Sequence, residues 1–427
     1  MDLKQLCSPR PDRFIPPREN INIELSNHLL TKNSQNGTPP LVKDLQKKIL
    51  NDGKEVKILS LKQKPPLPSS SLNENRVLYS YAHNSSKTLR SIPTHPELTL
   101  EAPNIEDDFY MNLLDWSCEN IIAIGLQNEV FFWNGNTSLI SKICCTPPSV
   151  KVTSVKWAPD GHHIAVGNDT STVQLWDTRQ MKLIRTLKSH PARVCSLNWN
   201  QCTLSTGSKD CSIINHDVRM RTHALSTWIY HSSEVCGLEW SPKGHQLACG
   251  ANDNVVSIWD ARNISDNLVK PLFALTAHRA AVKALSWAPF QSNLLATGGG
   301  SGDRHIRFWN TQTGCELNSI DTGSQVCSVK WANNSSKELV TSHGFSKNQL
   351  IVWKYPSLAK ISGNLVAHTQ RVLHLSLSPD STTVASAAGD EKLCFWKIFT
   401  PKSEAFAPGE SRAASSSKKM NHVTSLR

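Results

Sequence analysis

The stretch that indicates the fold reads Gly237-Leu-Glu-Trp240-Ser-Pro-Lys-Gly244, then Leu247-Ala-Cys-Gly250, then Val255-Val-Ser-Ile-Trp259-Asp260. It contains three short apolar segments, separated by Gly, Pro and polar residues of the kind that form turns. The same phrase occurs earlier, where Ser154-Val-Lys-Trp157-Ala-Pro-Asp-Gly161 leads to Ile164-Ala-Val-Gly167. Short apolar strands with turn residues at a regular spacing predict an all-β architecture.

Two series of residues, most of them Trp, follow this repeat through the sequence. The first has spacings of 43, 40, 43, 50, 44 and 43 residues and consists of Trp133, Trp176, His216, Trp259, Trp309, Trp353 and Trp396. The second keeps step with it and consists of Trp116, Trp157, Trp199, Trp240, Trp287, Trp331 and Leu377. A unit of about 40–45 residues with Trp-Asp endings is typical of WD-repeat β-propellers. The sequence therefore predicts a seven-bladed WD-repeat β-propeller over residues 99–398.

Polar residues recur in the same frame. A His precedes four of the repeats, namely His190, His231, His278 and His368. An Asp lies six residues before the matching first-series position, namely Asp210, Asp253, Asp303 and Asp390. We interpret each pair as a hydrogen-bonded brace that also contains a strand Ser or Thr and the Trp. The alternative is a Ser-His-Asp catalytic site, but near-identical copies in four repeats argue against it. We expect no enzymatic activity.

The two ends of the chain differ in composition from the repeats. After Trp396 only Lys397-Ile-Phe399 precedes a tail rich in Pro, Ser and Lys, so the last blade lacks an outer strand. An open edge invites aggregation, and Leu98-Thr-Leu100 is the expected donor of the missing strand. Residues 1–98 are predicted to be a mostly disordered arm, and 399–427 a flexible tail.

Charge and cysteine usage exclude several classes of function. Of the net charge of +11, the arm contributes +6, residues 99–398 contribute +2 and the tail +3, so the repeats lack the basic excess of a nucleic-acid binder. The twelve Cys include no Cys-x-x-Cys pair, and Cys195, Cys236 and Cys327 each lie four residues before a Trp. We interpret them as buried strand residues and expect no metal site and no cofactor. The absence of a long apolar segment or signal peptide predicts no membrane partner, and a location in cytoplasm and nucleus.

The arm contains one segment with the composition of a binding motif. The segment is Asp12, Arg13, Phe14, Ile15, Pro16, Pro17 and Arg18. Arg and aromatic side chains are the usual anchors of protein interfaces, and proline lowers the entropic cost of ordering a peptide. The segment is therefore a candidate protein-binding motif.

This segment resembles the C-box of the Fizzy family, WD-repeat activators of the anaphase-promoting complex, a ubiquitin ligase. The resemblance continues through Ala102-Pro103, Asp108-Phe-Tyr-Met-Asn-Leu-Leu-Asp-Trp116, His216-Asp-Val-Arg219, Gly250-Ala-Asn-Asp-Asn254, Ala296-Thr-Gly-Gly-Gly-Ser-Gly-Asp-Arg-His305, Ser324-Gln-Val-Cys327 and His343-Gly-Phe-Ser-Lys-Asn-Gln-Leu350. It covers the propeller and the C-box. The short arm is similar to that of the meiotic, insect Cortex-type branch.

The resemblance implies three segments that bind other proteins. The C-box, 12–18, would bind a TPR-repeat subunit of the ligase. The terminal Leu426 and Arg427 resemble the family's Ile-Arg ending, which binds a second TPR groove; Leu departs from the family's β-branched Ile. A segment over 57–65 resembles the family's spindle-checkpoint-protein-binding segment through Lys57, Ile58, Leu59 and Pro65.

The resemblance also implies two receptors for degrons, the short peptides that mark substrates such as cyclins for degradation. The family's KEN-box receptor matches Asp108, Asn252, Asn254, Ser301, Gln325 and Arg371. Asp108 suits the degron Lys, Arg371 suits its Glu, and the amides suit its Asn. The D-box receptor matches Leu100, Glu101 and Asn104, where the family usually has an acid in place of Asn104.

The predicted function is therefore that of a substrate-recruiting coactivator that promotes the degradation of cell-cycle proteins in mitosis or meiosis. Two alternatives remain. One is a WD-repeat scaffold without ligase-activating function, and the other is a hydrolase with its site at the propeller mouth. The second would need a unique acid/base or metal cluster, and the sequence shows none.

Overall fold

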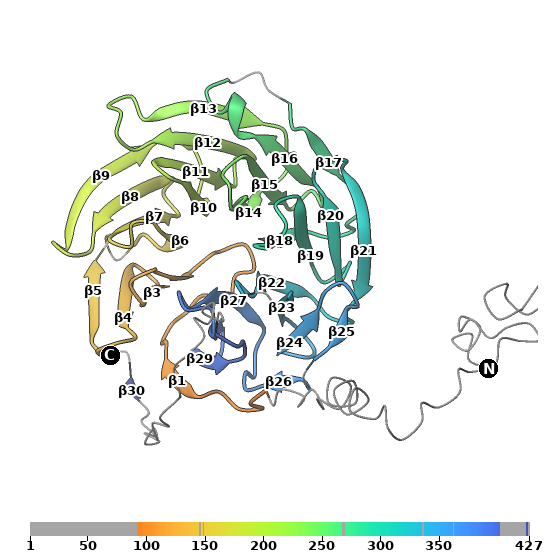
Figure 1. Cartoon of the computed structure of the whole chain (residues 1–427). Coiled ribbons are helices and arrows are strands. Elements are labelled where there is room, and N and C mark those ends of the chain that lie inside the picture. Colours follow the sequence, from red (N-terminus) through yellow and green to blue (C-terminus); the bar gives the residue numbers. More distant parts are fainter. Residues whose placement is uncertain are drawn as a thin grey trace, which may run out of the picture. The chain divides into compact units, whose positions relative to one another are not determined.

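The structure, a computed structural model, describes residues 92–401 except 145–146, 148, 267–269, 335–336 and 362, together with the backbone of 424–425. Its strands form seven sheets arranged as blades around a central axis (Figure 1), antiparallel except for the parallel pairing of β30 with β1, which confirms the predicted seven-bladed β-propeller. Most residues of the arm and tail, for which disorder was predicted, lie outside the described ones.

Each blade runs from an inner to an outer strand. Blade 1 contains β2 (Leu114–Trp116), β3 (Ile121–Leu126), β4 (Glu129–Asn134) and β5 (Ile140–Cys144); blade 2 contains β6 (Val152–Trp157), β7 (His163–Asn168), β8 (Thr172–Asp177) and β9 (Lys182–Lys188). Blade 3 contains β10 (Val194–Asn200), β11 (Thr203–Ser208), β12 (Ser212–Asp217) and β13 (Ala224–Ile229); blade 4 contains β14 (Val235–Trp240), β15 (Gln246–Ala251), β16 (Val256–Asp260), the 3-10 turn η5 (Ala261–Asn263) and β17 (Phe273–Leu275).

The remaining blades follow the same plan. Blade 5 contains β18 (Val282–Trp287), β19 (Leu294–Gly299), β20 (His305–Asn310) and β21 (Cys315–Asp321). Blade 6 contains β22 (Val326–Trp331), β23 (Glu338–His343), β24 (Gln349–Lys354), β25 (Ala359–Lys360) and β26 (Leu365–Val366). Blade 7 contains β27 (Val372–Leu377), β28 (Thr383–Ala388), β29 (Lys392–Lys397), β1 (Leu98–Glu101) and the backbone of β30 (Thr424–Ser425).

The ring closes through β1, as the sequence predicted. This strand precedes the first blade in the chain but pairs antiparallel with β29 of the last, with Leu98 opposite Phe395 and Leu100 opposite Leu393. Leu100 is 1% exposed and belongs to an apolar cluster that contains residues of blades 1, 2 and 7. The innermost strands of the first and last blades, β2 and β27, lie next to each other. Burial of this apolar surface stabilises the closed ring.

The two Trp series occupy two different strands of each blade. Second-series residues lie at or next to the end of the innermost strand, and first-series residues lie in the third strand. Several second-series indoles donate to the neighbouring blade: Trp287 Nε1 donates to Glu239 O (2.9 Å) and Trp331 Nε1 donates to Ser286 O (3.1 Å). The repeated Trp residues of the second series therefore hydrogen-bond adjacent blades to each other as well as packing between the strands. Cys195, Cys236 and Cys327 are fully buried, which confirms their predicted environment.

The predicted braces are present. In blade 5, His278 Nδ1 lies 2.6 Å from Asp303 Oδ2 and His278 Nε2 lies 2.6 Å from Thr297 Oγ1. Trp309 Nε1 donates to the same hydroxyl at 2.9 Å. Blades 4 and 7 repeat this arrangement with Ser257 and Ser386 as the hydroxyl residues. These residues satisfy one another's buried polar atoms, so each brace has a structural role.

Blades 3 and 6 have variants of this pattern. In blade 3, His216 takes the place of the Trp, and its Nε2 lies 3.1 Å from Thr206 Oγ1. In blade 6, His343 contacts Thr341 Oγ1 (2.8 Å) and Ser324 Oγ (3.0 Å), and this arrangement was not predicted. Burial lowers the pKa of both His216 and His343 to about 3. Both imidazoles are therefore neutral in the folded protein near neutral pH.

Replacing Thr297 with Val should destabilise the propeller by about 2–4 kcal/mol, because the change leaves the Trp309 N–H and His278 Nε2 buried without a partner. Urea unfolding of the purified chain measures this loss. The control is Thr313→Val at an exposed turn, whose hydroxyl accepts one long bond of 3.4 Å. Equal unfolding midpoints for the two variants would contradict the brace.

The buried neutral imidazole of His343 should make folding sensitive to acid. The unfolded state gains a proton near pH 6.5 and the folded state only near pH 3, so the free energy of unfolding falls as the pH drops through this window. Between pH 7 and 5 this one group should account for about 1–2 kcal/mol. His343→Gln should therefore reduce the loss of stability between these pH values. An unaltered pH dependence in His343→Gln would refute this assignment.

Candidate functional site

A pocket of about 650 Å³ lies at one end of the central axis, beside the segment that leads from β1 to β2. Its lining consists of Asp107, Asp108, Phe109, Tyr110, Asn252, Asn254, Ala280, Ala281, Gly300, Ser301, Gln325 and Arg371. The structure thus brings all six predicted KEN-receptor residues together, although they are separated by up to 263 residues in the chain. Their role in binding stays a prediction.

The crossing segment is fixed by its own side chains. Asn112 Nδ2 donates to the carbonyl oxygens of Cys195 (2.8 Å) and Cys236 (3.0 Å) on the innermost strands of blades 3 and 4. Phe109 is buried against Cys327 and Leu373 from blades 6 and 7. The segment is therefore attached to both sides of the ring, and the residues before Phe109 are held over the inner rim.

The rim has a regular origin in the repeat. In blades 2 to 7, the residue directly before the innermost strand occupies an equivalent position. These six residues are Lys151, Arg193, Glu234, Ala281, Gln325 and Arg371. We call these the rim positions. Three successive acids of the crossing segment each form an ion pair with a rim cation: Glu106 with Lys151 (2.5 Å), Asp107 with Arg371 (2.6 Å) and Asp108 with Arg193 (2.9 Å). The acids therefore connect the segment to blades 2, 7 and 3.

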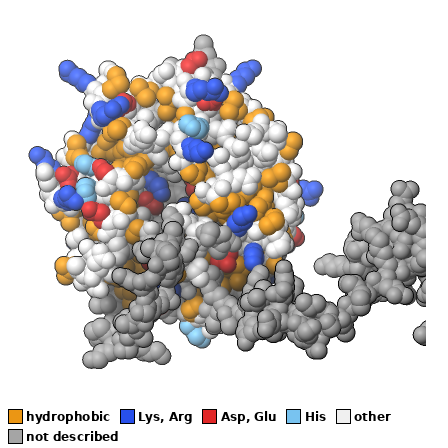
Figure 2. All heavy atoms as spheres, in the orientation of Figure 1, with side chains coloured by type: hydrophobic (Ala, Val, Ile, Leu, Met, Phe, Trp, Pro, Cys, Tyr) orange, Lys and Arg blue, Asp and Glu red, His pale blue; other side chains and the backbone are white. Residues whose placement is uncertain are grey.

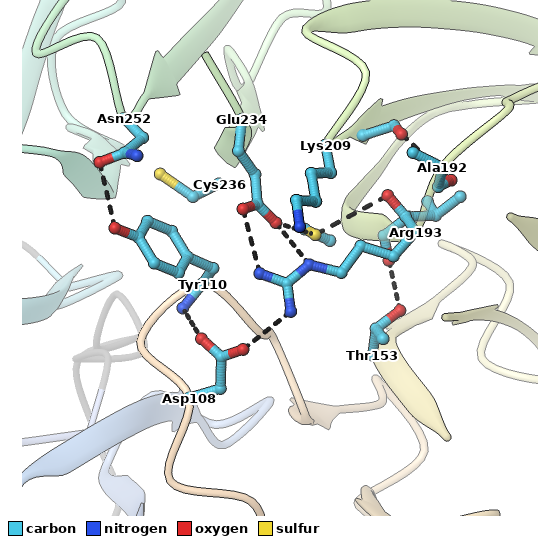
Figure 3. Close-up of polar contacts among 12 residues, drawn as sticks. Asp108, Tyr110, Thr153, Ala192, Arg193, Lys209, Glu234, Cys236 and Asn252 are labelled. Carbon is cyan, nitrogen blue, oxygen red and sulfur yellow. Dashed lines mark hydrogen bonds and ion pairs between the residues drawn. The ribbon is translucent and has the colours of Figure 1, made fainter. Parts of the chain in front are cut away.

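The acidic end of the pocket is centred on Asp108 (Figure 3). Asp108 Oδ1 accepts from the Tyr110 N–H at 2.9 Å, and its Oδ2 accepts from Arg193 Nη1 at 2.9 Å. Arg193 also donates through Nε (2.8 Å) and Nη2 (3.0 Å) to Glu234, and these hydrogen bonds raise its pKa against the opposing effect of burial. The Tyr110 hydroxyl donates to Asn252 Oδ1 at 3.1 Å, and burial raises its pKa.

The basic end is centred on Arg371. Its Nε donates to Asp107 Oδ1 at 2.6 Å and its Nη2 donates to Asp107 O at 2.7 Å. The guanidinium carbon lies 6.0 Å from the ring centroid of Phe345, an exposed aromatic residue between β23 and β24. Below it, Lys283 Nζ donates to Leu373 O at 3.1 Å, and burial lowers the Lys283 pKa to about 8.

Amide side chains lie between the two ends. Asn252 is held by its backbone N–H, which donates to Glu234 O at 2.9 Å. Gln325 packs closely on Gly344, where a Cβ atom would lie only 2.7 Å from Gln325 Oε1, so any larger residue would displace the amide. A carboxylate, amides and a guanidinium in this arrangement fit a peptide that presents a cation, an amide and an anion.

The predicted D-box residues lie at the junction of blades 1 and 7, but not all at the surface. Glu101 is exposed, whereas the Leu100 side chain is buried and supports the junction from within. Asn104 has a φ of 60°, a left-handed conformation that Asn tolerates, and its N–H donates to Glu391 Oε1 at 3.0 Å. Glu391 thus adds a second carboxylate near Glu101, which sequence reasoning missed.

A second concavity, of about 640 Å³, lies at the other end of β1. Trp116, Trp133 and Phe395 form its apolar wall, and the ring centroids of Trp133 and Phe395 are 4.9 Å apart. Both Trp residues belong to the repeat series and were interpreted as structural. Both are only partly buried.

The other predicted sites lie outside the described residues. These are the C-box over 12–18, the segment over 57–65 and the terminal Leu426 and Arg427. Among the residues that the structure describes, no group of three or more His, Cys, Asp or Glu could hold a metal ion. Nor does the described part contain a helix with the length and apolarity needed to span a bilayer. On the face seen in Figure 2, Lys and Arg side chains are spread around the ring.

Known proteins resemble this chain over most of its length. The family model of the CDC20/Fizzy WD40 domain matches residues 100–396. Anaphase-promoting complex subunit cdc20 of Dictyostelium discoideum is 49% identical over 384 residues, which cover 87% of this chain and 76% of that protein. Cell division cycle 20.1, cofactor of APC complex, of Arabidopsis thaliana is 48% identical over 400 residues, which cover 91% and 87%.

A solved structure gives the same result. A chain of the crystal structure of the mitotic checkpoint complex is 46% identical and superposes with a TM-score of 0.69, covering 73% of this chain and 98% of that chain. The Cortex-type branch stays a prediction. The family resemblance is confirmed, and the chain belongs to the CDC20/Fizzy family of WD40-domain proteins.

Proposed function

We propose that this protein is a substrate-recruiting cofactor of the anaphase-promoting complex, which binds degrons on its propeller and the ligase through its arm and tail. Relatives that are 49% and 48% identical are named as a subunit and a cofactor of that complex. The observation that carries the substrate-binding part is the single pocket that joins Asp108, Arg371 and the amides between them. No bond is made or broken by the protein itself in this proposal.

The pocket's chemistry supports a Lys-Glu-Asn degron. Each oxygen of Asp108 accepts one hydrogen bond in the structure, and a carboxylate has room for further donors such as an ammonium group. Arg371 uses Nε and Nη2 toward Asp107, which leaves Nη1 available for the degron carboxylate. Asn252, Asn254 and Gln325 offer donors and acceptors to the degron amide.

Removing the charge of Arg371 should weaken a Lys-Glu-Asn peptide by about tenfold to a hundredfold, the usual cost of one charge-assisted hydrogen bond. Fluorescence polarisation of the labelled peptide with the full-length protein measures this change in affinity. The matched control is Arg221→Gln, at an exposed position between β12 and β13. A Lys-Gln-Asn peptide should bind wild type and Arg371→Gln equally weakly, and full affinity in Arg371→Gln would contradict the receptor.

The ligase-binding part depends on the C-box. Replacing residues 12–18 with a Gly/Ser segment of equal length should abolish capture of ligase subunits and ubiquitination of a D-box reporter, while peptide binding to the pocket persists. The same replacement over residues 66–72 of the arm is the control. Undiminished capture after the C-box replacement would favour the alternative of a WD-repeat scaffold without ligase-activating function.

The solved mitotic checkpoint complex supports checkpoint proteins as further partners. In this proposal they bind the segment over 57–65, whose basic and apolar residues suit an extended strand added to a partner's sheet.

A further inference from the structure

Three rim cations pair with the acids of the crossing segment, and one of them differs from the others. Within the described residues, Arg193 is the member of this set that has a second carboxylate, Glu234, within ion-pair distance. Both carboxylates approach the same guanidinium, Glu234 through Nε and Nη2 and Asp108 through Nη1 (Figure 3). Lys151 and Arg371 each have one acid of the segment as partner. The blade 3 corner therefore carries one more negative charge than the other two.

The two carboxylates of this corner differ in exposure. The Glu234 side chain is 8% exposed, and it is not part of the pocket lining. The Asp108 side chain is 27% exposed and lines the pocket. Glu234 also accepts from the Cys195 thiol at 2.6 Å, and burial raises the pKa of that thiol, so it stays a neutral donor. Glu234 is thus fixed beneath the pocket and Asp108 faces into it.

Charge balance then assigns a role to Glu234. Asp108 and Arg193 alone would form a neutral pair, and a neutral pair attracts a cation only weakly. With Glu234 on the far side of the guanidinium, Asp108, Arg193 and Glu234 together carry one net negative charge, and Asp108 is the more exposed of the two carboxylates. Because the site is partly buried, such a charge acts on a nearby ligand more strongly than it would in open water.

We infer that Glu234 and Arg193 are positioning residues that give this end of the pocket its specificity for a cationic side chain. Arg193 contacts Asp108 and would neutralise its charge, and Glu234 offsets the charge of Arg193 so that the charge of Asp108 remains available to the ligand. This inference rests on the proposed degron receptor, in which Asp108 receives the degron Lys. It names two residues outside the pocket lining that determine the preference for that Lys.

The neighbouring groups are compatible with this role. Tyr110 remains a neutral hydrogen-bond donor because burial raises its pKa. Lys283 contributes positive charge from below, and its Nζ is directed to Leu373 O. The Glu234 backbone carbonyl accepts from Asn252, so the residue also positions an amide of the pocket. A test must therefore separate the charge of Glu234 from its packing.

The test compares two peptides, one with Lys-Glu-Asn and one with norleucine in place of Lys, on the full-length protein. Norleucine keeps the aliphatic chain and removes the ammonium group. Wild type should prefer the Lys peptide. Glu234→Gln should weaken the Lys peptide by about tenfold or more and leave the norleucine peptide within about threefold of its wild-type affinity.

The double variant Arg193→Gln/Glu234→Gln decides between charge and packing. It removes one charge of each sign and leaves Asp108 with its Tyr110 bond, so the Lys preference should return to within about threefold of wild type. If Glu234 acted only by packing, the double variant would bind the Lys peptide more weakly than the single variant does. The affinities for the Lys and norleucine peptides would then fall by the same factor. Should Glu234→Gln not fold, Arg193→Gln alone should discriminate more strongly for Lys than wild type does.

The outcomes distinguish this inference from the proposed function. Wild type that does not bind the Lys peptide would overturn both. Wild type that binds and prefers Lys, together with variants whose preference is unchanged, would overturn only the role of Glu234 and Arg193. A lost preference in Glu234→Gln that returns in the double variant would support the inference.

Discussion

The antiparallel pairing of β1 with β29 is the constraint on which the rest of the molecule depends. In a propeller the last blade must pack against the first to close the ring, and an incomplete last blade would leave an unpaired strand edge. Here the return is made by a strand from before the first repeat, and its Leu100 is buried in a cluster shared with neighbouring blades. The same strand then leads directly into the crossing segment. Closure therefore fixes both the ring and the entry of the chain into the candidate site.

The candidate site is a product of that geometry. Six blades each contribute the residue before their innermost strand to one rim, so side chains far apart in the sequence become neighbours. The acids Glu106, Asp107 and Asp108 attach the crossing segment to three blades and at the same time determine the charge at each corner. The ion pairs are partly exposed, so their contribution to stability is modest. Their greater effect is to orient Asp108 and Arg371 at the two ends of the pocket.

Much of the fold was predictable because it repeats. The spacing of the Trp series gave the number of blades, the strand missing after Trp396 indicated closure by Leu98–Leu100, and the His and Asp copies indicated the braces. The polar contacts of blade 6 were harder to predict. Its His343 lies in the same strand as Thr341, unlike the brace His residues of blades 4, 5 and 7, which precede the innermost strand. The repeat gave Trp116 and Trp133 a structural role but did not indicate that they also line a concavity beside β1.

The candidate site was predictable in part. The six pocket residues came from the family resemblance, and the structure brings them together. The sequence did contain a signal for Arg193 and Glu234, because every rim position lies six residues before a second-series residue. Which rim residues pair with which acid depends on how the crossing segment lies, and repeat spacing contains no information on that. Glu391 was not predicted for the same reason, because its contact with Asn104 forms only when β1 closes the ring.

The most direct test of the account is a crystal structure of the protein with a bound Lys-Glu-Asn peptide. We expect the peptide ammonium group within hydrogen-bonding distance of Asp108 and the peptide carboxylate at Arg371, with the Glu234–Arg193 ion pair intact beneath. A peptide bound on another face of the ring, or in this pocket with its charges reversed, would contradict it.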